Sequence, residues 1–305
     1  MKTILVTGAT GFVGKHFVKA AMKKYKVICL ARETSDISIL PPELDVRYGD
    51  LLNKDSLISA TKNIDYVVNL GASVQSIDKD ENYRTNVVGT QNLVDVCKQN
   101  NIKKIIHLSS VNVTFGKLGM YGETKLQSES IVKNSGLPYV ILRPETIYGH
   151  GDKGLSLSYK LLSKNKNIPI IGDAYVRPIY VNDVCTAILN SLTNKVALNN
   201  TYYIGGASKL TIKQYMEKVA AITNTGNKRF IRFPSWPFKI IVKLNEALGK
   251  RWLMTYEQYL SITQTKELDI SLAEKDLNLK PLDFDTGLKL WLEEVKPNEN
   301  FVSAR

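Results

Sequence analysis

Residues 7–14 read Thr7-Gly8-Ala9-Thr10-Gly11-Phe12-Val13-Gly14 and lie between a short apolar run and a helical pattern. This order predicts a strand, a tight turn and a helix. Gly8 permits the turn, Gly11 lets the backbone approach a pyrophosphate, and Gly14 lets helix and strand pack closely. The free N–H groups at the helix N-terminus favour phosphate binding, so we expect a dinucleotide here. The residues expected to contact it are Gly8, Thr10, Gly11, Phe12, Val13 and Gly14.

Apolar strand patterns alternate with helical patterns over the first half of the chain. The strand patterns cover 2–7, 26–31, 44–48, 65–70, 103–108 and 138–143, and the helical patterns cover 12–24, 82–99 and 120–135. Such alternation is typical of a parallel sheet covered by helices on both faces. After Gly149 this alternation of strand and helical patterns ends. The pattern of residues 150–177 predicts one helix and a short turn segment. We therefore predict an α/β fold with a doubly wound parallel sheet and a smaller C-terminal domain.

The end of the second predicted strand bears on the choice of cofactor. Dinucleotide-binding folds usually place an acidic residue there to accept hydrogen bonds from the ribose. Here Ala31 takes that place and Arg32 follows it. A guanidinium suits a 2′-phosphate, so the sequence favours NADP over NAD. The alternative is a solvent-exposed arginine with no role in cofactor binding.

A tyrosine and a lysine lie four residues apart in Tyr121-Gly-Glu-Thr-Lys125 and share one face of the predicted helix. An ammonium near a phenol lowers the phenol pKa, as a general acid–base at a hydroxyl or carbonyl carbon requires. Ser109 and Ser110 follow a predicted strand upstream. The Ser110 hydroxyl is suited to polarising a substrate oxygen, whereas Ser109 is expected to support the turn.

Composition limits the other function classes. The chain has 41 Lys and Arg against 29 Asp and Glu, a net charge of +12, which favours anionic small molecules. No aromatic–basic signature accompanies this charge, so we expect no nucleic-acid partner. No segment is long and apolar enough to span a membrane, and the N-terminus has no signal-peptide layout, so we interpret the protein as cytoplasmic. The three cysteines and three histidines are scattered, and no metal site is expected.

An apolar segment with nearby lysines follows Pro234-Ser-Trp-Pro237 and predicts a helix over 237–248. Its apolar residues are Trp236, Phe238, Ile240, Ile241, Val242 and Leu244. A membrane-surface helix is one interpretation. We favour a lid helix over the substrate instead, and expect no membrane partner.

Together these motifs resemble the extended short-chain dehydrogenase/reductase superfamily, and within it the NAD-dependent epimerase/dehydratase family. The matching segments are 7–14, Gly49-Asp-Leu51, Asn69-Leu-Gly-Ala72, Asn86-Val-Val-Gly-Thr90, Ser109-Ser110, Tyr121 to Lys125, Arg143-Pro144, Ile147-Tyr-Gly149, Val181-Asn-Asp183, Tyr203-Ile-Gly-Gly206 and Asp269-Ile-Ser-Leu-Ala273. They span nearly the whole chain in family order. The resemblance implies a Rossmann domain of 1–150 plus about 178–205. A substrate-binding domain of 151–177 plus 206–305 would complete the chain.

The resemblance also implies roles for individual residues. Those implied at the cofactor are Asp50 and Leu51 at the adenine, Leu70, Gly71 and Ala72 along the cleft, Asn86 beneath the site, Tyr121 and Lys125 near the ribose, and Pro144 and Ile147 beside the nicotinamide. Arg177 stands where sugar-nucleotide enzymes bind a diphosphate. Its alternative is a structural ion pair.

Two departures from the family pattern concern the substrate. The stretch from Ser110 to Tyr121 is short, as in atypical members such as the steroid-dehydrogenase-like enzymes. Asn112 and Val113 stand where sugar dehydratases keep a second acid and base. Hydride transfer or epimerisation is therefore favoured over dehydration.

The expected function is that of an NAD(P)-dependent epimerase or oxidoreductase acting on a nucleotide sugar, with Ser110, Tyr121 and Lys125 as catalytic residues. One alternative is an NADPH-dependent reductase or dehydrogenase of a steroid-like or flavonoid-like ketone or alcohol. Another is a non-catalytic dinucleotide-binding subunit. The resemblance also implies a homodimer formed through the helices around 82–99 and 120–135.

Overall fold

The computed structural model describes residues 1–74, 78–248, 254–265 and 268–295. Two compact units divide the chain. The first comprises Met1–Pro144, Val184–Ile204 and Asp269–Leu279, and the second comprises Glu145–Asp183, Gly205–Leu268 and Lys280–Arg305. Among the described residues, no helix combines the length and apolarity of a membrane span.

The first unit is built on a seven-stranded parallel sheet, as the alternation of patterns predicts. The strands, in spatial order, are β11 (Asn200–Ile204), β6 (Tyr139–Pro144), β5 (Lys104–Leu108), β4 (Tyr66–Asn69), β1 (Thr3–Thr7), β2 (Lys26–Ala31) and β3 (Asp45–Tyr48). The chain runs outward from β1 in one direction to β3 and returns to β4 on its other side. The carboxyl ends of β1 and β4 therefore form the switch point at which open α/β sheets bind ligands.

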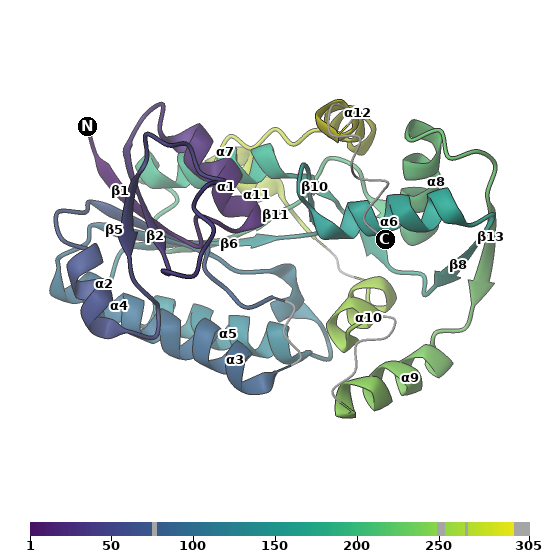
Figure 1. The fold of residues 1–305 in the computed structure, drawn as a ribbon, viewed down its shortest axis with the longest axis horizontal. Coiled ribbons are helices and arrows are strands. Elements are labelled where there is room, and N and C mark those ends of the chain that lie inside the picture. Colours follow the sequence, from purple (N-terminus) through teal and green to yellow (C-terminus); the bar gives the residue numbers. More distant parts are fainter. Residues whose placement is uncertain (75–77, 249–253, 266–267, 296–305) are drawn as a thin grey trace. The chain divides into compact units, whose positions relative to one another are not determined.

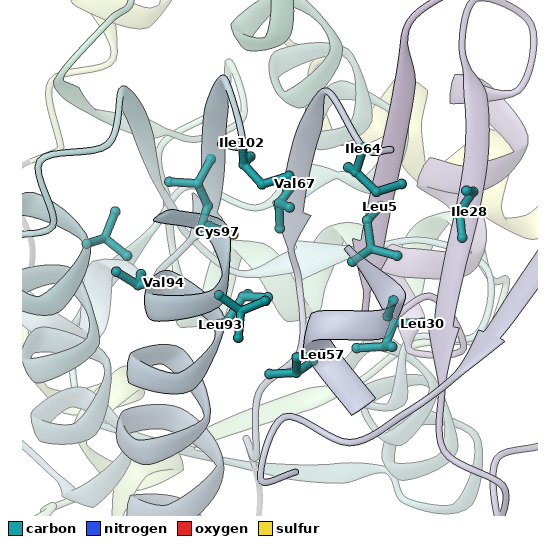
Figure 2. Close-up of a cluster of buried hydrophobic side chains, with 14 of the residues drawn as sticks. Leu5, Ile28, Leu30, Leu57, Ile64, Val67, Leu93, Val94, Cys97 and Ile102 are labelled. Carbon is teal, nitrogen blue, oxygen red and sulfur yellow. The ribbon is translucent and has the colours of Figure 1, made fainter. Parts of the chain in front are cut away.

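Helices cover both faces of this sheet (Figure 1). On one face lie α2 (Lys54–Ala60), α4 (Gly89–Gln99) and α5 (Met120–Lys133), and on the other lie α1 (Phe12–Ala21), α7 (Val181–Thr193) and α11 (Ser271–Asp276). Under α2 and α4, alternate side chains of the strands form an apolar core that includes Leu5, Leu30 and Val67 (Figure 2). The fold class is thus the doubly wound α/β class that the sequence predicts.

The helix expected over 82–99 is divided into three parts. These are α3 (Lys79–Tyr83), a π-helical turn at Arg84–Val88 and α4. The π-turn widens the helix where Asn86 turns inward, and Asn86 is fully buried. Such turns often mark functional positions in helices.

The second unit contains three two-stranded sheets and several helices. The strand pairs are β7 (Ile147–Tyr148) with β10 (Ile179–Tyr180), β9 (Tyr175–Val176) with β12 (Leu210–Thr211), and β8 (Asn167–Ile171) with β13 (Arg229–Phe233). Its helices include α6 (Lys153–Lys164), α8 (Ile212–Ile222), α9 (Trp236–Ala247), α10 (Tyr256–Thr263) and α12 (Phe284–Val295). The expectation of only a helix and a turn segment over 150–177 was wrong, because β8 and β9 form there. Each pairs with a strand distant in sequence, which local patterning does not reveal.

Candidate active site

The glycine turn has the shape that a dinucleotide pyrophosphate requires. Gly8 has φ +66°, and a Cβ there would lie 2.8 Å from the carbonyl oxygen of Leu70. A Cβ on Gly14 would lie 2.1 Å from the carbonyl oxygen of Gly8. Helix α1 starts at Phe12 with no side-chain cap and no acidic residue in its first turn, so its N–H groups remain available to an anion. This turn therefore fits a dinucleotide.

The residues expected along the cofactor cleft converge on the same edge of the sheet. Leu70, Gly71 and Ala72 directly follow β4, and the N–H of Gly71 donates to Thr7 Oγ1 at 3.1 Å. A Cβ on Gly71 would lie 3.1 Å from both Leu51 Cδ1 and Thr7 Oγ1. Leu51 therefore packs against Gly71 beside the turn, and this tight packing favours glycine there.

Arg32 and Asp50 follow the two strands beyond β1. Arg32 comes directly after β2 and is exposed. Asp50 lies after β3, and its Oδ1 accepts a hydrogen bond from the N–H of Leu52 at 2.8 Å. Both residues thus end up at the carboxyl edge, on the side of β1 where a bound adenosine lies in this fold.

Three polar side chains lie in a row on neighbouring strands, next to the apolar core and close to the carboxyl ends of the strands. Strand register aligns Thr7 with Asn69 and Asn69 with His107. Because side chains alternate along strands, these residues point to the same face as the apolar core. Thr7 Oγ1 donates to Asn69 Oδ1 at 2.6 Å, and Asn69 Nδ2 lies 3.1 Å from His107 Nδ1. All three are buried.

The directions of these hydrogen bonds fix the tautomer of His107. Thr7 accepts from Gly71 and therefore donates to Asn69, which leaves the Asn69 amide to donate to His107 Nδ1. His107 Nε2 then carries the proton and points to Ser128 Oγ at 3.1 Å. Burial lowers the pKa of His107 well below its usual value, and the Lys125 charge lowers it further. The imidazole is therefore neutral.

Lys125 lies at the end of this row. Its Nζ donates to the main-chain carbonyl of Leu108 at 2.7 Å and lies 3.4 Å from His107 Nε2. The side chain is 2% exposed. Burial lowers the pKa of Lys125 to about 8, an effect that the charge of Glu129 opposes. A cation is thus held close to the edge of the sheet with little solvent screening.

The other two predicted catalytic residues lie on elements next to Lys125. Tyr121 is half-buried, one turn before Lys125 on α5. Ser110 follows β5, caps the short helix Val111–Thr114, and is 9% exposed. Its Oγ accepts from the N–H of Asn112 at 3.1 Å, so its own proton remains available for donation.

A buried ion pair fixes α5 against the sheet. Arg143, on β6, donates to Glu129 Oε1 at 2.8 Å and to Oε2 at 2.7 Å. Ser109 donates to Glu129 Oε1 at 2.6 Å, which connects the end of β5 to α5. Burial would raise the pKa of Glu129, but the hydrogen bonds from Arg143 and Ser109 outweigh it and hold the pKa below its usual value. Glu129 therefore stays charged one turn after Lys125.

Asn86 connects the cofactor edge to α5. Its Oδ1 accepts from the N–H of Ser73 at 2.8 Å, and its Nδ2 donates to the carbonyl of Ser73 and to Thr124 Oγ1, each at 3.0 Å. The amide thus holds the loop after β4 next to the residue preceding Lys125.

The remaining predicted residues lie at or beyond the boundary of the first unit. Pro144 ends β6 in the first unit, whereas Ile147 begins β7 in the second. Arg177 lies between β9 and β10 of the second unit, and its N–H donates to Glu145 Oε2 at 3.0 Å. The guanidinium reaches the carbonyl of Leu268 at 3.5 Å, and its buried Nε has no hydrogen-bond partner among the described residues.

Sequence reasoning missed Asn69, His107 and Glu129 as members of this site. A signal was present for the first two: each is a polar residue that ends or nearly ends an otherwise apolar strand, as Thr7 does. Glu129 lies four residues after Lys125, on the same helix face.

Comparisons with known proteins identify the family of the chain. Residues 4–205 match the model of the NAD dependent epimerase/dehydratase family. The chain belongs to this family and is an NAD(P)-dependent enzyme of the short-chain dehydrogenase/reductase type.

Individual relatives cover most of the chain. It is 27% identical to the uncharacterized protein y4nG of Sinorhizobium fredii, over 92% of this chain and 75% of that protein. It is 25% identical to UDP-glucose 4-epimerase of Vibrio cholerae, over 92% and 91%. The crystal structure of UDP-glucuronic acid 4-epimerase from Bacillus cereus, in complex with UDP-glucuronic acid and NAD, has a TM-score of 0.75 at 23% identity, over 97% and 99%.

Proposed function

We propose that this enzyme transfers a hydride at one ring carbon of a nucleotide-linked sugar, with Tyr121, Lys125 and Ser110 as its catalytic residues. The observation that carries the proposal is the placement of Lys125. A buried ammonium held by the Leu108 carbonyl, one helical turn from Tyr121, costs folding free energy. Such a group is expected where its charge serves a reaction.

Tyr121 moves the proton in the proposed mechanism. As the substrate hydroxyl is oxidised, its proton passes to the phenolate oxygen of Tyr121 while the carbon loses a hydride. The nicotinamide ring, when bound, supplies the hydride acceptor. The Lys125 ammonium would stabilise the negative charge of the phenolate. In the reverse direction Tyr121 returns the proton to the carbonyl oxygen.

Ser110 positions the substrate oxygen. Its Oγ is oriented by the N–H of Asn112, and its remaining proton is free to point at the oxygen that Tyr121 protonates. Asn112 is neutral and offers no second acid or base. This supports hydride transfer or epimerisation rather than dehydration.

Arg32 supports a preference for NADP over NAD. It is exposed directly after β2, where a carboxylate would otherwise accept from the ribose hydroxyls. A guanidinium there pairs with a 2′-phosphate.

Arg177 supports an anionic substrate. Its buried Nε lacks a protein partner among the described residues, which is costly unless a ligand supplies an acceptor. A sugar diphosphate offers suitable oxygens. The epimerases from Vibrio cholerae and Bacillus cereus carry UDP-sugars in their names, consistent with this substrate class.

Three further proposals concern the whole molecule. The first unit would bind the cofactor and the second the substrate. A homodimer would form through the outer faces of α4 and α5, near Val88 and Leu126, each 37% exposed. The enzyme would act in the cytoplasm.

The proposal is tested by identifying the nucleotide that co-purifies and then screening UDP-, GDP- and dTDP-sugars for hydride exchange with it. Retained cofactor that cycles during turnover supports an epimerase, and NADPH that is consumed stoichiometrically supports a reductase. The absence of exchange with all three sugar classes would contradict the nucleotide-sugar assignment.

A further inference from the structure

Helix α9 presents an apolar stripe to solvent. Trp236, Ile240 and Leu244 are 66%, 53% and 59% exposed, and Leu248, just after the helix, is 68% exposed. The four residues recur at every fourth position, so they lie on one side of the helix. Large apolar side chains gathered in this way mark an interaction site more often than isolated ones do.

The opposite side of α9 is fixed by contacts within the second unit. Val242 is 1% exposed. Glu246 Oε1 accepts from the N–H of Tyr256 at 2.6 Å, at the start of α10, and Lys243 Nζ lies 5.2 Å from the Tyr256 ring centroid. The helix is therefore held through its inner side while its apolar stripe faces outward.

The segment of the sequence that contains the stripe is basic. Between residues 228 and 248 the cations are Lys228, Arg229, Arg232, Lys239 and Lys243, and the only carboxylate is Glu246. Glu246 is turned to α10 by its hydrogen bond. Outside this segment, Asp173 lies 3.6 Å from Arg232 and offsets one of these charges. Lys250 and Arg251 continue the basic sequence outside the described residues. An apolar stripe with a terminal tryptophan and flanking lysines matches the requirements of an anionic lipid surface.

We propose that α9 docks the enzyme on an anionic phospholipid surface, with Trp236, Ile240 and Leu244 entering the interface and Lys239 facing the headgroups. This departs from our expectation of a lid helix and no membrane partner. The charge of the segment favours lipid over an uncharged protein groove, because the basic groups gain from a negative surface potential. Docking involves neither Tyr121 nor Lys125, so it can be tested independently of the proposed reaction.

The test is co-sedimentation of the full-length protein with phosphatidylcholine vesicles, with and without phosphatidylglycerol. We expect binding to the anionic vesicles, at least about tenfold weaker binding to the neutral ones, and release by salt. The double variant Ile240→Glu/Leu244→Glu should lose the binding. The matched control is Leu157→Glu/Leu161→Glu on α6, because these leucines are also four apart and 60% and 36% exposed. It should bind like wild type.

Thermal unfolding of both variants confirms that each is folded before it is scored. Three results would overturn the proposal: no sedimentation of wild type with anionic vesicles, equal loss in both double variants, or unchanged binding in the α9 variant. Light scattering tests whether the stripe instead binds a second copy of the chain. If wild type is a dimer that only the α9 variant dissociates, and neither binds vesicles, the stripe is a contact between copies of the chain.

Discussion

The Nζ of Lys125 lies 3.4 Å from Nε2 of His107, and both side chains are buried. Since Nε2 carries the imidazole proton, neither group accepts from the other. The ammonium is held instead by the Leu108 carbonyl, beside an uncharged ring. A charged imidazolium here would place two cations in contact, which explains why the network around His107 keeps it neutral.

Replacement of Lys125 by Met should separate activity from stability. The pKa of Lys125 falls from 10.5 to about 8 on folding, so the native protein gains stability as pH rises from about 8 to 10.5. Below pH 8 the buried charge is a cost that Lys125→Met removes. We expect kcat to fall by about 10²–10⁴-fold while the protein unfolds at no lower temperature at pH 7.

The control for this variant is Lys104→Met. Lys104 is also a buried lysine in the same sheet, and its Nζ donates to the carbonyls of Ser191 and Leu192 at 3.0 Å each. Burial also lowers the pKa of Lys104, so this variant should likewise unfold at no lower temperature at pH 7, and it should keep its kcat. Equal loss of activity in the two variants would show that Lys125 acts only through folding.

His107 should make stability depend on pH below about 6.5. Its pKa lies at 6.5 when unfolded and well below that when folded, so the unfolded chain binds the extra proton. Stability should therefore fall by about 1.4 kcal/mol for each pH unit below 6.5. In His107→Gln this contribution of about 1.4 kcal/mol per pH unit should be absent between pH 5 and 6.5, as measured by denaturant unfolding. An unchanged slope would show that His107 is not the titrating group.

The Gly8 turn predicts a difference between two glycine substitutions. Gly8 and Gly136 have φ +66° and +77°, but a Cβ meets backbone atoms only at Gly8 and open space at Gly136. Gly136→Ala should cost about 1–2 kcal/mol from its backbone conformation alone. Gly8→Ala should cost more and also abolish cofactor binding, as measured by fluorescence titration with NADPH and NADH. Equal stability costs and intact binding would contradict the proposed role of the glycine turn in binding the cofactor.

Arg32 should set the choice between the two cofactors. In wild type we expect tighter binding of NADPH than of NADH. Arg32→Ala should weaken NADPH binding by about 10–100-fold, because it removes a charge-assisted contact worth about 1.5–3 kcal/mol, and leave NADH unchanged. Calorimetric titration of both cofactors measures this. Equal affinities in wild type would refute the preference.

Local patterns predicted the glycine turn, six of the central strands and the helix that carries Tyr121 and Lys125. These features depend on periodicity and turn chemistry within short windows. Strand β11 joins β6 at the sheet edge, and β8 pairs with β13. Both depend on contacts between distant segments.

Local patterns mark Thr7, Asn69 and His107 as polar residues near strand ends, but they do not show that the three side chains meet. Thr7, Asn69 and His107 meet only because the register of three parallel strands aligns them. The same holds for Glu129 and Arg143, which α5 and β6 bring together. The sequence therefore identified the residues proposed to react, and the structure added those that hold them in place.

The central claim is that the Tyr121 phenol transfers the substrate proton, and single-turnover hydride transfer in Tyr121→Phe tests it most directly. With the sugar nucleotide found in the substrate screen, the rate should fall by about 10²–10⁴-fold, while the cofactor dissociation constant changes little. A rate equal to that of wild type would contradict the account.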